Sequence, residues 1–109
     1  EIAALTSEID RIAQSAEFNG IQLLDGTGGS VGIQVGINTN TYDSIAIDLA
    51  TNRDSATLGL ATGIDTTANA TSAMAEVVAA IDTVSSARSD FGAVQNRLEV
   101  SIRTLITAL

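Results

Sequence analysis

The chain has 109 residues, no Cys, no His and a formal net charge of −8. This composition excludes disulfides and thiolate metal sites, and it removes the side chain that most often serves as a general base or a metal ligand. The negative charge argues against nucleic acid as a partner, because nucleic-acid binding needs a basic surface. No apolar run reaches the length of about 18 residues that a membrane-spanning helix needs, so no membrane contact is expected.

The first predicted element is a helix over residues 1–17. Its apolar side chains return at spacings of three and four residues, which is the period of a helix packed along another helix. These seam positions are Ile2, Leu5, Ile9 and Ile12. A helix this short is not stable alone in water, so we expect it to pack on another element.

Residues 18–50 predict a turn, a loop and a β-hairpin. Asn19-Gly20 tolerates positive φ and fits either a helix C-cap or a turn. Strict alternation of apolar with polar or small residues over 31–37, and again over 45–49, predicts two strands joined by the turn-forming residues 38–41. A two-stranded hairpin is marginal by itself, so its apolar face should rest on the helices. Residues 51–65 form a connection.

The loop Asp25-Gly26-Thr27-Gly28 is the stretch that most resembles a chemical motif. It shares its composition with the Asp-Thr-Gly loop of aspartic proteases, but a second Asp loop to share a proton is missing. A phosphate-binding interpretation lacks the necessary Lys. We interpret the loop as a Gly-rich turn, and we expect no enzymatic activity, no catalytic residue, no metal and no cofactor.

Residues 66–109 predict one long helix, around which the rest of the chain is organised. Apolar positions follow a four-three spacing for more than four heptads, and Gly92 is the weak helix former within them. At 1.5 Å per residue the helix would be about 65 Å long. Asp65, Thr66 or Thr67 could supply its N-cap. The apolar seam positions of this helix are Val77, Ile81, Val84, Phe91, Leu98, Ile102 and Leu105.

Two polar residues, Arg88 and Gln95, interrupt the apolar seam of the long helix. They either extend to solvent at the edge of the seam or fix the register in which helices pair. The face from Arg88 to Arg103, which includes Arg97, mixes both signs of charge. It is either a solvated face or a surface between subunits.

These elements together predict a mainly α fold of the α+β class, in a single domain over residues 1–109. The long C-terminal helix should pack antiparallel on the shorter N-terminal helix, with the hairpin at the side. The helical pattern continues to both ends of the chain, so we expect a piece of a longer helical protein. Its exposed seams could pair with a second copy, giving a homodimer of the fragment.

Three stretches resemble bacterial flagellin. The first is Glu8 to Ala13 followed by Glu17 to Gly26, the second is Ile33 to Gly36, and the third is Ala87 to Leu98. They occur in the family's order and cover nearly the whole chain. The third stretch is similar to the C-terminal core-helix motif of the family and is the most specific of the three.

The resemblance implies the filament-core domain usually called D1, a structural subunit of the bacterial flagellar filament that serves motility. It implies an extracellular location, reached through the flagellar type III apparatus without a cleaved signal peptide. It implies assembly with other flagellin subunits through D1 helix–helix contacts. It also implies recognition by Toll-like receptor 5, so the alternative function is a receptor-binding or antibody-binding module that acts as an innate immune ligand.

The resemblance also bears on contact residues. Glu8 matches a receptor-contacting Glu of the family, and the region around Ala87 and Arg88 is expected to face the same side. The positions expected to contact a receptor or another subunit are Glu8, Arg11, Arg88, Gln95 and Arg97.

Overall fold

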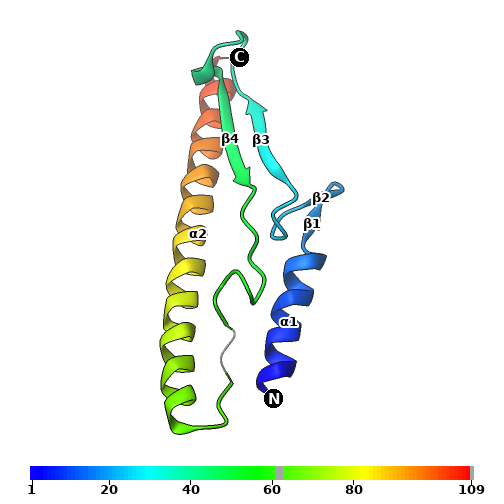
Figure 1. Cartoon of the computed structure of the whole chain (residues 1–109). Coiled ribbons are helices and arrows are strands. Elements are labelled where there is room, and N and C mark those ends of the chain that lie inside the picture. Colours follow the sequence, from blue (N-terminus) through cyan, green and yellow to red (C-terminus); the bar gives the residue numbers. More distant parts are fainter. Residues whose placement is uncertain (61–62, 109) are drawn as a thin grey trace.

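The computed structural model describes residues 1–60 and 63–108. The described elements, in chain order, are α1 (Ile2–Ser15), β1 (Glu17–Phe18), β2 (Ile21–Gln22), β3 (Gly29–Gln34), the 3-10 turn η1 (Thr41–Asp43), β4 (Ser44–Leu49) and α2 (Thr67–Ala108). The molecule measures 63 × 24 × 20 Å and has a radius of gyration of 18.3 Å. Figure 1 shows that α2 runs along the whole length of the molecule. The mainly α, α+β fold predicted from the sequence is therefore confirmed, and the molecule has the elongated shape that a helix of the predicted length imposes.

The long helix α2 begins one residue later than predicted and is continuous through Gly92. The Asn69 backbone N–H donates to Thr66 Oγ1 at 3.1 Å, so Thr66 provides the N-terminal cap among the three candidates. The Asn69 Nδ2 group also donates to Asp65 Oδ1 at 2.6 Å, which adds an acceptor just before the helix. Leu109, the last position of the predicted helix, lies outside the described residues.

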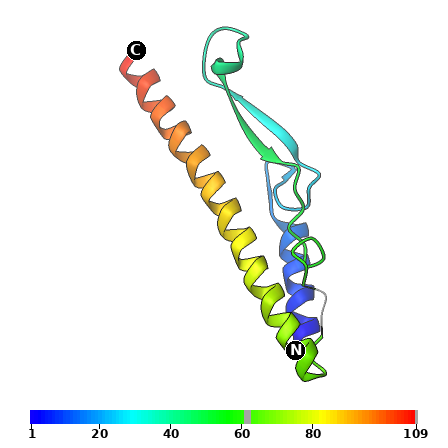
Figure 2. The same cartoon turned by 60° about the vertical axis from the view of Figure 1, so that its left-hand side comes forward.

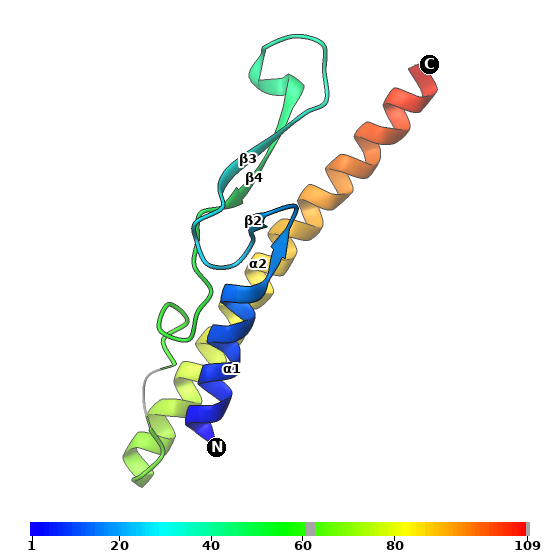
Figure 3. The ribbon, with the colours of Figure 1, turned by 90° about the vertical axis from the view of Figure 1, so that its right-hand side faces the viewer.

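The predicted hairpin is formed by β3 and β4, which pair antiparallel with Val31 opposite Ile47 and Ile33 opposite Ile45. Its first strand ends at Gln34, earlier than the alternation suggested, because Val35 and Gly36 both donate their backbone N–H to Asp43 O and enter the turn. Strand β4 makes the main contact between the hairpin and α2. The hairpin thus lies beside the C-terminal half of α2, and its turn leans away from the end of the helix, as Figures 2 and 3 show.

A second, very small sheet follows α1. Phe18 pairs with Ile21, which leaves Asn19 and Gly20 as a two-residue turn with φ values of 54° and 77°. Positive φ at both positions is what a type I′ hairpin turn needs, and Asn-Gly is the pair that best provides it. The helix itself ends earlier, at Ser15. Of the two interpretations of Asn19-Gly20, the turn is therefore confirmed and the helix C-cap is not.

The two helices run in the same direction, so the predicted antiparallel packing is wrong. In Figures 1 and 3 the N-terminus of α1 lies near the start of α2, and both helices rise toward the same end. The reason is the path of the chain between them. Strand β4 leads back down the molecule, and residues 50–60 continue this descent before α2 begins. The Ser55 N–H donates to Asp10 Oδ1 at 2.7 Å, which fixes the descending segment to α1.

The core is thin and aliphatic. Among the described residues, the buried apolar side chains are Ala13, Ile45, Leu49 and Ala80, with exposed fractions between 2% and 7%. Figure 2 shows why: α1 and the hairpin lie along one side of α2, and the opposite side of the helix faces no other element. A single layer of contacts leaves much apolar surface uncovered.

Candidate contact surface

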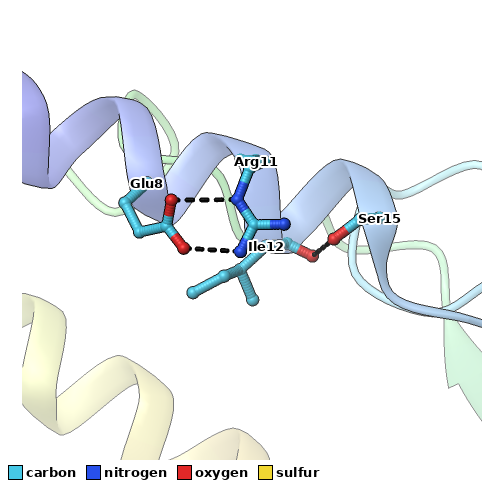
Figure 4. Close-up of polar contacts among 4 residues, drawn as sticks. All are labelled: Glu8, Arg11, Ile12 and Ser15. Atoms are coloured by element: carbon cyan, nitrogen blue, oxygen red, sulfur yellow. Dashed lines mark hydrogen bonds and ion pairs between the residues drawn. The ribbon is translucent and has the colours of Figure 1, made fainter.

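Two of the expected contact residues form an ion pair on α1. The Arg11 Nε group donates to Glu8 Oε2 at 2.9 Å, and Arg11 Nη2 lies 2.5 Å from Glu8 Oε1. Figure 4 shows this two-point contact between Glu8 and Arg11, which lie about one helical turn apart on the surface of α1. Both side chains are exposed, Arg11 to 64% and Glu8 to 51%. The helix periodicity places them together because residues three apart share a face.

This pairing changes the protonation equilibrium of Glu8. Its hydrogen bonds with Arg11, and secondarily the positive charge of Arg11, lower the pKa of the Glu8 carboxyl below its ordinary value. The same hydrogen bonds raise the pKa of Arg11. Both groups are therefore charged at neutral pH and are already oriented toward each other. A partner that bound here would meet a paired carboxylate and guanidinium rather than two separate charges.

The other expected contact residues lie on α2 and do not form one cluster. Gln95 Nε2 donates to Glu99 Oε1 at 3.3 Å, so these two side chains share a face. Arg88 lies on that face as well, since it is two helical turns before Gln95. Arg97 follows Arg88 by nine residues, which places it on about the opposite side of the helix. The structure therefore brings Arg88 and Gln95 to one face and Arg97 to another.

The predicted seam residues are mostly exposed within this chain. Ile9, Phe91 and Leu98 are half-buried, whereas the other eight are exposed: Ile2, Leu5, Ile12, Val77, Ile81, Val84, Ile102 and Leu105. The two stripes therefore do not close on each other as an internal seam. A role for them in contacts with another chain remains a prediction.

The inward face of α2 is a different stripe, which sequence reasoning missed. Ala73, Ala80 and Ala87 recur every seven residues along it, and Val94 continues the series as a half-buried residue. The signal was present in the heptad spacing of Ala. It was hidden because small side chains contribute little to a search for large apolar residues. Alanine suits this face because it allows neighbouring backbone to approach closely.

Most of the exposed large apolar side chains of α2, all but Val100 among the described residues, form what we call the exposed α2 stripe. It has a lower part, Met74, Val77, Val78, Ile81 and Val84, and an upper part, Ile102, Leu105 and Ile106. Their exposed fractions range from 40% to 71%. Scattered single apolar residues need no explanation, whereas a row of them along one helix is what a surface for another chain would require.

The remaining features of the described residues suit structure rather than chemistry. Asp25 Oδ1 accepts hydrogen bonds from the Thr27 Oγ1 and N–H groups, at 2.6 and 2.9 Å, and these bonds lower the pKa of Asp25. This is a local turn, as expected for the Gly-rich loop. Within residues 1–60 and 63–108, no group of acidic side chains could hold a metal ion, and no helix is long and apolar enough to cross a membrane.

A shallow hollow lies between the hairpin and α2. Asp48 and Arg53 line it from the side of β4 and the connection, and Asp90 and Phe91 line it from α2. Its charged residues are of both signs, and Phe91 supplies the apolar wall. The hollow follows from the loose fit between a two-stranded sheet and a single helix.

Comparison with known proteins gives a consistent family. No protein-family model matches the chain. Flagellin FlaB1 of Treponema pallidum is 31% identical over 120 aligned residues, which cover 94% of this chain and 41% of that protein. A flagellin of Halalkalibacterium halodurans is 39% identical over 110 aligned residues, 99% of this chain and 40% of that protein. B-type flagellin of Pseudomonas aeruginosa is 41% identical over 56 residues, 51% of this chain and 11% of that protein.

The chain thus spans about two fifths of the length of the two relatives that it matches over nearly its full extent. The long α2 helix and the hairpin beside it are elements that the flagellin resemblance implied. The chain is a flagellin fragment.

Proposed function

We propose that this chain is part of a structural subunit of the bacterial flagellar filament, which serves motility and lies outside the cell after type III export without a cleaved signal. The chain would correspond to the D1 filament core, and its contacts would be helix–helix contacts with other flagellin subunits. The observation that carries the proposal is the exposed α2 stripe. A monomeric protein has no use for so many uncovered apolar side chains along one helix.

The thin core supports the same proposal. Where α1, the hairpin and α2 meet, burial is confined to a few small or aliphatic residues, Ala13, Ile45, Leu49 and Ala80. Such a part gains stability when neighbouring subunits cover its exposed side, because burial of apolar surface contributes about 25 cal/mol per Å². The absence of any acidic cluster that could hold a metal, within the described residues, gives no support to an enzymatic role.

Competition in filament growth tests this proposal. The chain would be added in molar excess to flagellin of Halalkalibacterium halodurans, and filament elongation would be followed by light scattering and electron microscopy. We expect the chain to slow elongation by occupying subunit surfaces. Ile81→Asp, in the exposed α2 stripe, should abolish the effect, whereas the exposed control Ser89→Ala should retain it. Elongation at an unchanged rate in the presence of the chain would contradict the proposal.

Recognition by Toll-like receptor 5 is the alternative function that we propose for this fragment. The observation that favours it is the exposed Glu8–Arg11 pair, two opposite charges held side by side on the surface of α1. Glu8→Ala should weaken binding to the purified receptor ectodomain by about 1 kcal/mol or more if Glu8 is a hot spot. The urea midpoint should barely change, because the pair is exposed. Equal affinity of Glu8→Ala and of the control Ser7→Ala would contradict a receptor contact at Glu8.

We also propose that the isolated chain self-associates. In this fragment the exposed α2 stripe has no partner from the same chain among the described residues. A second copy can supply one. Sedimentation equilibrium over a range of concentrations measures this directly, and a monomer mass at every concentration would contradict it.

A further inference from the structure

The exposed face of α2 carries a symmetric pattern. Eight positions form one narrow strip along the helix, and they can be paired by their equal distance in sequence from the middle of the strip. From the ends toward the middle, the pairs are Val77 with Ile106, Ile81 with Ile102, Val84 with Glu99, and Arg88 with Gln95. The midpoint of every pair falls between Phe91 and Gly92. At 3.6 residues per turn, all eight positions lie within a sector of about 60°. All eight side chains are exposed.

Two of the four pairs are apolar on both sides and the central pair is polar on both sides, whereas the remaining pair sets Val84 beside Glu99. Apart from that pair, the strip is complementary to a second copy of itself turned end for end. From this symmetry we infer that two copies of the chain pair through α2 as an antiparallel dimer, with the two-fold axis next to Gly92. This inference deepens the self-association proposed above and rests on that proposal, not on filament assembly. It names the face, the direction and the register of the pairing.

The apolar ends of the strip agree with this register. Ile81 of one copy would lie opposite Ile102 of the other, and Val77 would lie opposite Ile106. The symmetry repeats both contacts at the other end of the pair. These four residues are 47% to 65% exposed in the single chain, so each has surface to bury. Apolar residues at helical spacing on both partners are what a two-stranded helical seam needs.

The charged centre of the strip decides the direction. In the antiparallel register, Arg88 faces Gln95 of the second copy and lies within one turn of its Glu99, so two opposite-charge contacts form. In a parallel pair, Arg88 would face Arg88 and Glu99 would face Glu99. Like charges that face each other across a helical seam are unfavourable and select against that arrangement. The Gln95–Glu99 hydrogen bond at 3.3 Å places both residues on the face that this contact uses.

The crossing point of the two helices also fits. Gly92 lies beside the proposed two-fold axis, and a Cβ built on it would meet nothing within 4 Å. The helix therefore has no internal need for glycine at this position, where glycine costs roughly 1 kcal/mol relative to alanine. At an axis between two helices, the missing side chain lets the backbones approach closely.

Disulfide trapping tests the direction, and the absence of Cys from the chain makes it a clean experiment. Ile81→Cys and Ile102→Cys would be made separately, oxidised alone and as a mixture, and analysed for covalent dimers. We expect the mixture to cross-link and each variant alone to remain uncross-linked, since like positions lie about 31 Å apart along an antiparallel pair. Ser89→Cys, exposed on another side of α2, is the control for random oxidation.

Charge exchange tests the register independently. Arg88→Glu and Glu99→Arg should each raise the dimer dissociation constant by about tenfold or more in sedimentation equilibrium, and the double variant should restore it to within about threefold. Ile81→Asp should give a monomer whose circular dichroism is unchanged. A monomer mass for the unmodified chain would overturn self-association altogether. A dimer mass with cross-linking of Ile81→Cys alone, or without rescue by the double variant, would overturn only the antiparallel register.

Discussion

Asp10 of α1 accepts a hydrogen bond at 2.7 Å from the backbone N–H of Ser55, a residue 45 positions later in the chain. This contact is partly buried and joins α1 to the segment that descends from β4. It also accounts for the parallel course of the two helices, because the descending segment runs beside α1 before α2 begins (Figure 1).

Loss of this contact should destabilise the fold. We expect Asp10→Ala to lower the free energy of unfolding by about 1–2 kcal/mol, because a partly buried N–H group loses a charged acceptor. Urea denaturation followed by circular dichroism measures the change. Gln14→Ala, exposed one turn later on α1, is the control and should leave the midpoint unchanged. A midpoint for Asp10→Ala equal to that of the control would show that the Asp10–Ser55 contact contributes nothing.

Two glycine positions should respond in opposite directions to the same substitution. At Gly28 a Cβ would collide with the Gln22 carbonyl oxygen and lie 2.9 Å from Leu49 Cβ, so Gly28→Ala should cost about 1–3 kcal/mol. At Gly92 a Cβ would meet nothing within 4 Å, and Gly92→Ala should stabilise the isolated, dilute monomer by about 0.5–1 kcal/mol. Thermal unfolding at low concentration compares the two variants. A change of the same sign in the unfolding temperature of both variants would contradict the described packing around Gly28 and Gly92.

The cap of α2 offers a third prediction. Thr66 Oγ1 accepts the Asn69 N–H at 3.1 Å, so Thr66→Ala should lower stability by about 1 kcal/mol and should fray the start of the helix. Thr66→Ser, which keeps the oxygen, is the matched control. Hydrogen exchange of the Asn69 amide reports directly on the cap. Protection that is unaltered in Thr66→Ala would mean that another group satisfies this donor.

Acid should weaken the turns of this chain. Hydrogen bonds with Thr27 lower the pKa of Asp25, and hydrogen bonds with Thr57 lower the pKa of Asp54, from the ordinary value of 3.8. Because the folded chain binds these protons more weakly than the unfolded chain, the stabilisation is complete above pH 3.8. This stabilisation is lost as the pH falls through the lower pKa values that the two carboxyl groups have in the folded chain.

The variant Asp25→Ala isolates this effect. It should be less stable than the parent at about pH 6, and the difference should shrink as the pH falls below the ordinary Asp value. Urea midpoints at several pH values measure it. A difference in urea midpoint between Asp25→Ala and the parent that stays constant with pH would contradict the assigned direction of the Asp25 pKa shift.

The extent of α2 and the β3–β4 hairpin could be predicted because their signals are local. Heptad spacing, strand alternation and turn residues each lie within a few positions of the structure that they specify. The direction of α1 could not be predicted, because it depends on the path of residues 50–60 and on the Asp10–Ser55 contact across the chain. No periodicity in α1 records that contact.

The contact surface shows a similar division. The pairing of Glu8 with Arg11 follows from their spacing, and the structure adds only its two-point geometry. The inward face of α2 was missed because it presents Ala80 and Ala87, whereas the large side chains Val77 and Ile81 point elsewhere and dominated the pattern. Which of the two apolar stripes of α2 is covered depends on where the chain places its other elements, such as β4, beside the helix.

The link between Asp10 and Ser55 also bears on the order in which the chain folds. Strands β3 and β4 are close in sequence, and α2 needs only its own residues to form. Asp10 and Ser55 are 45 positions apart, so α1 can dock on this segment only after the β3–β4 hairpin and the Asp25–Asn52 bridge have brought the intervening chain together. We therefore expect α1 to join last, and its amides to be among the first to exchange when the folded chain opens.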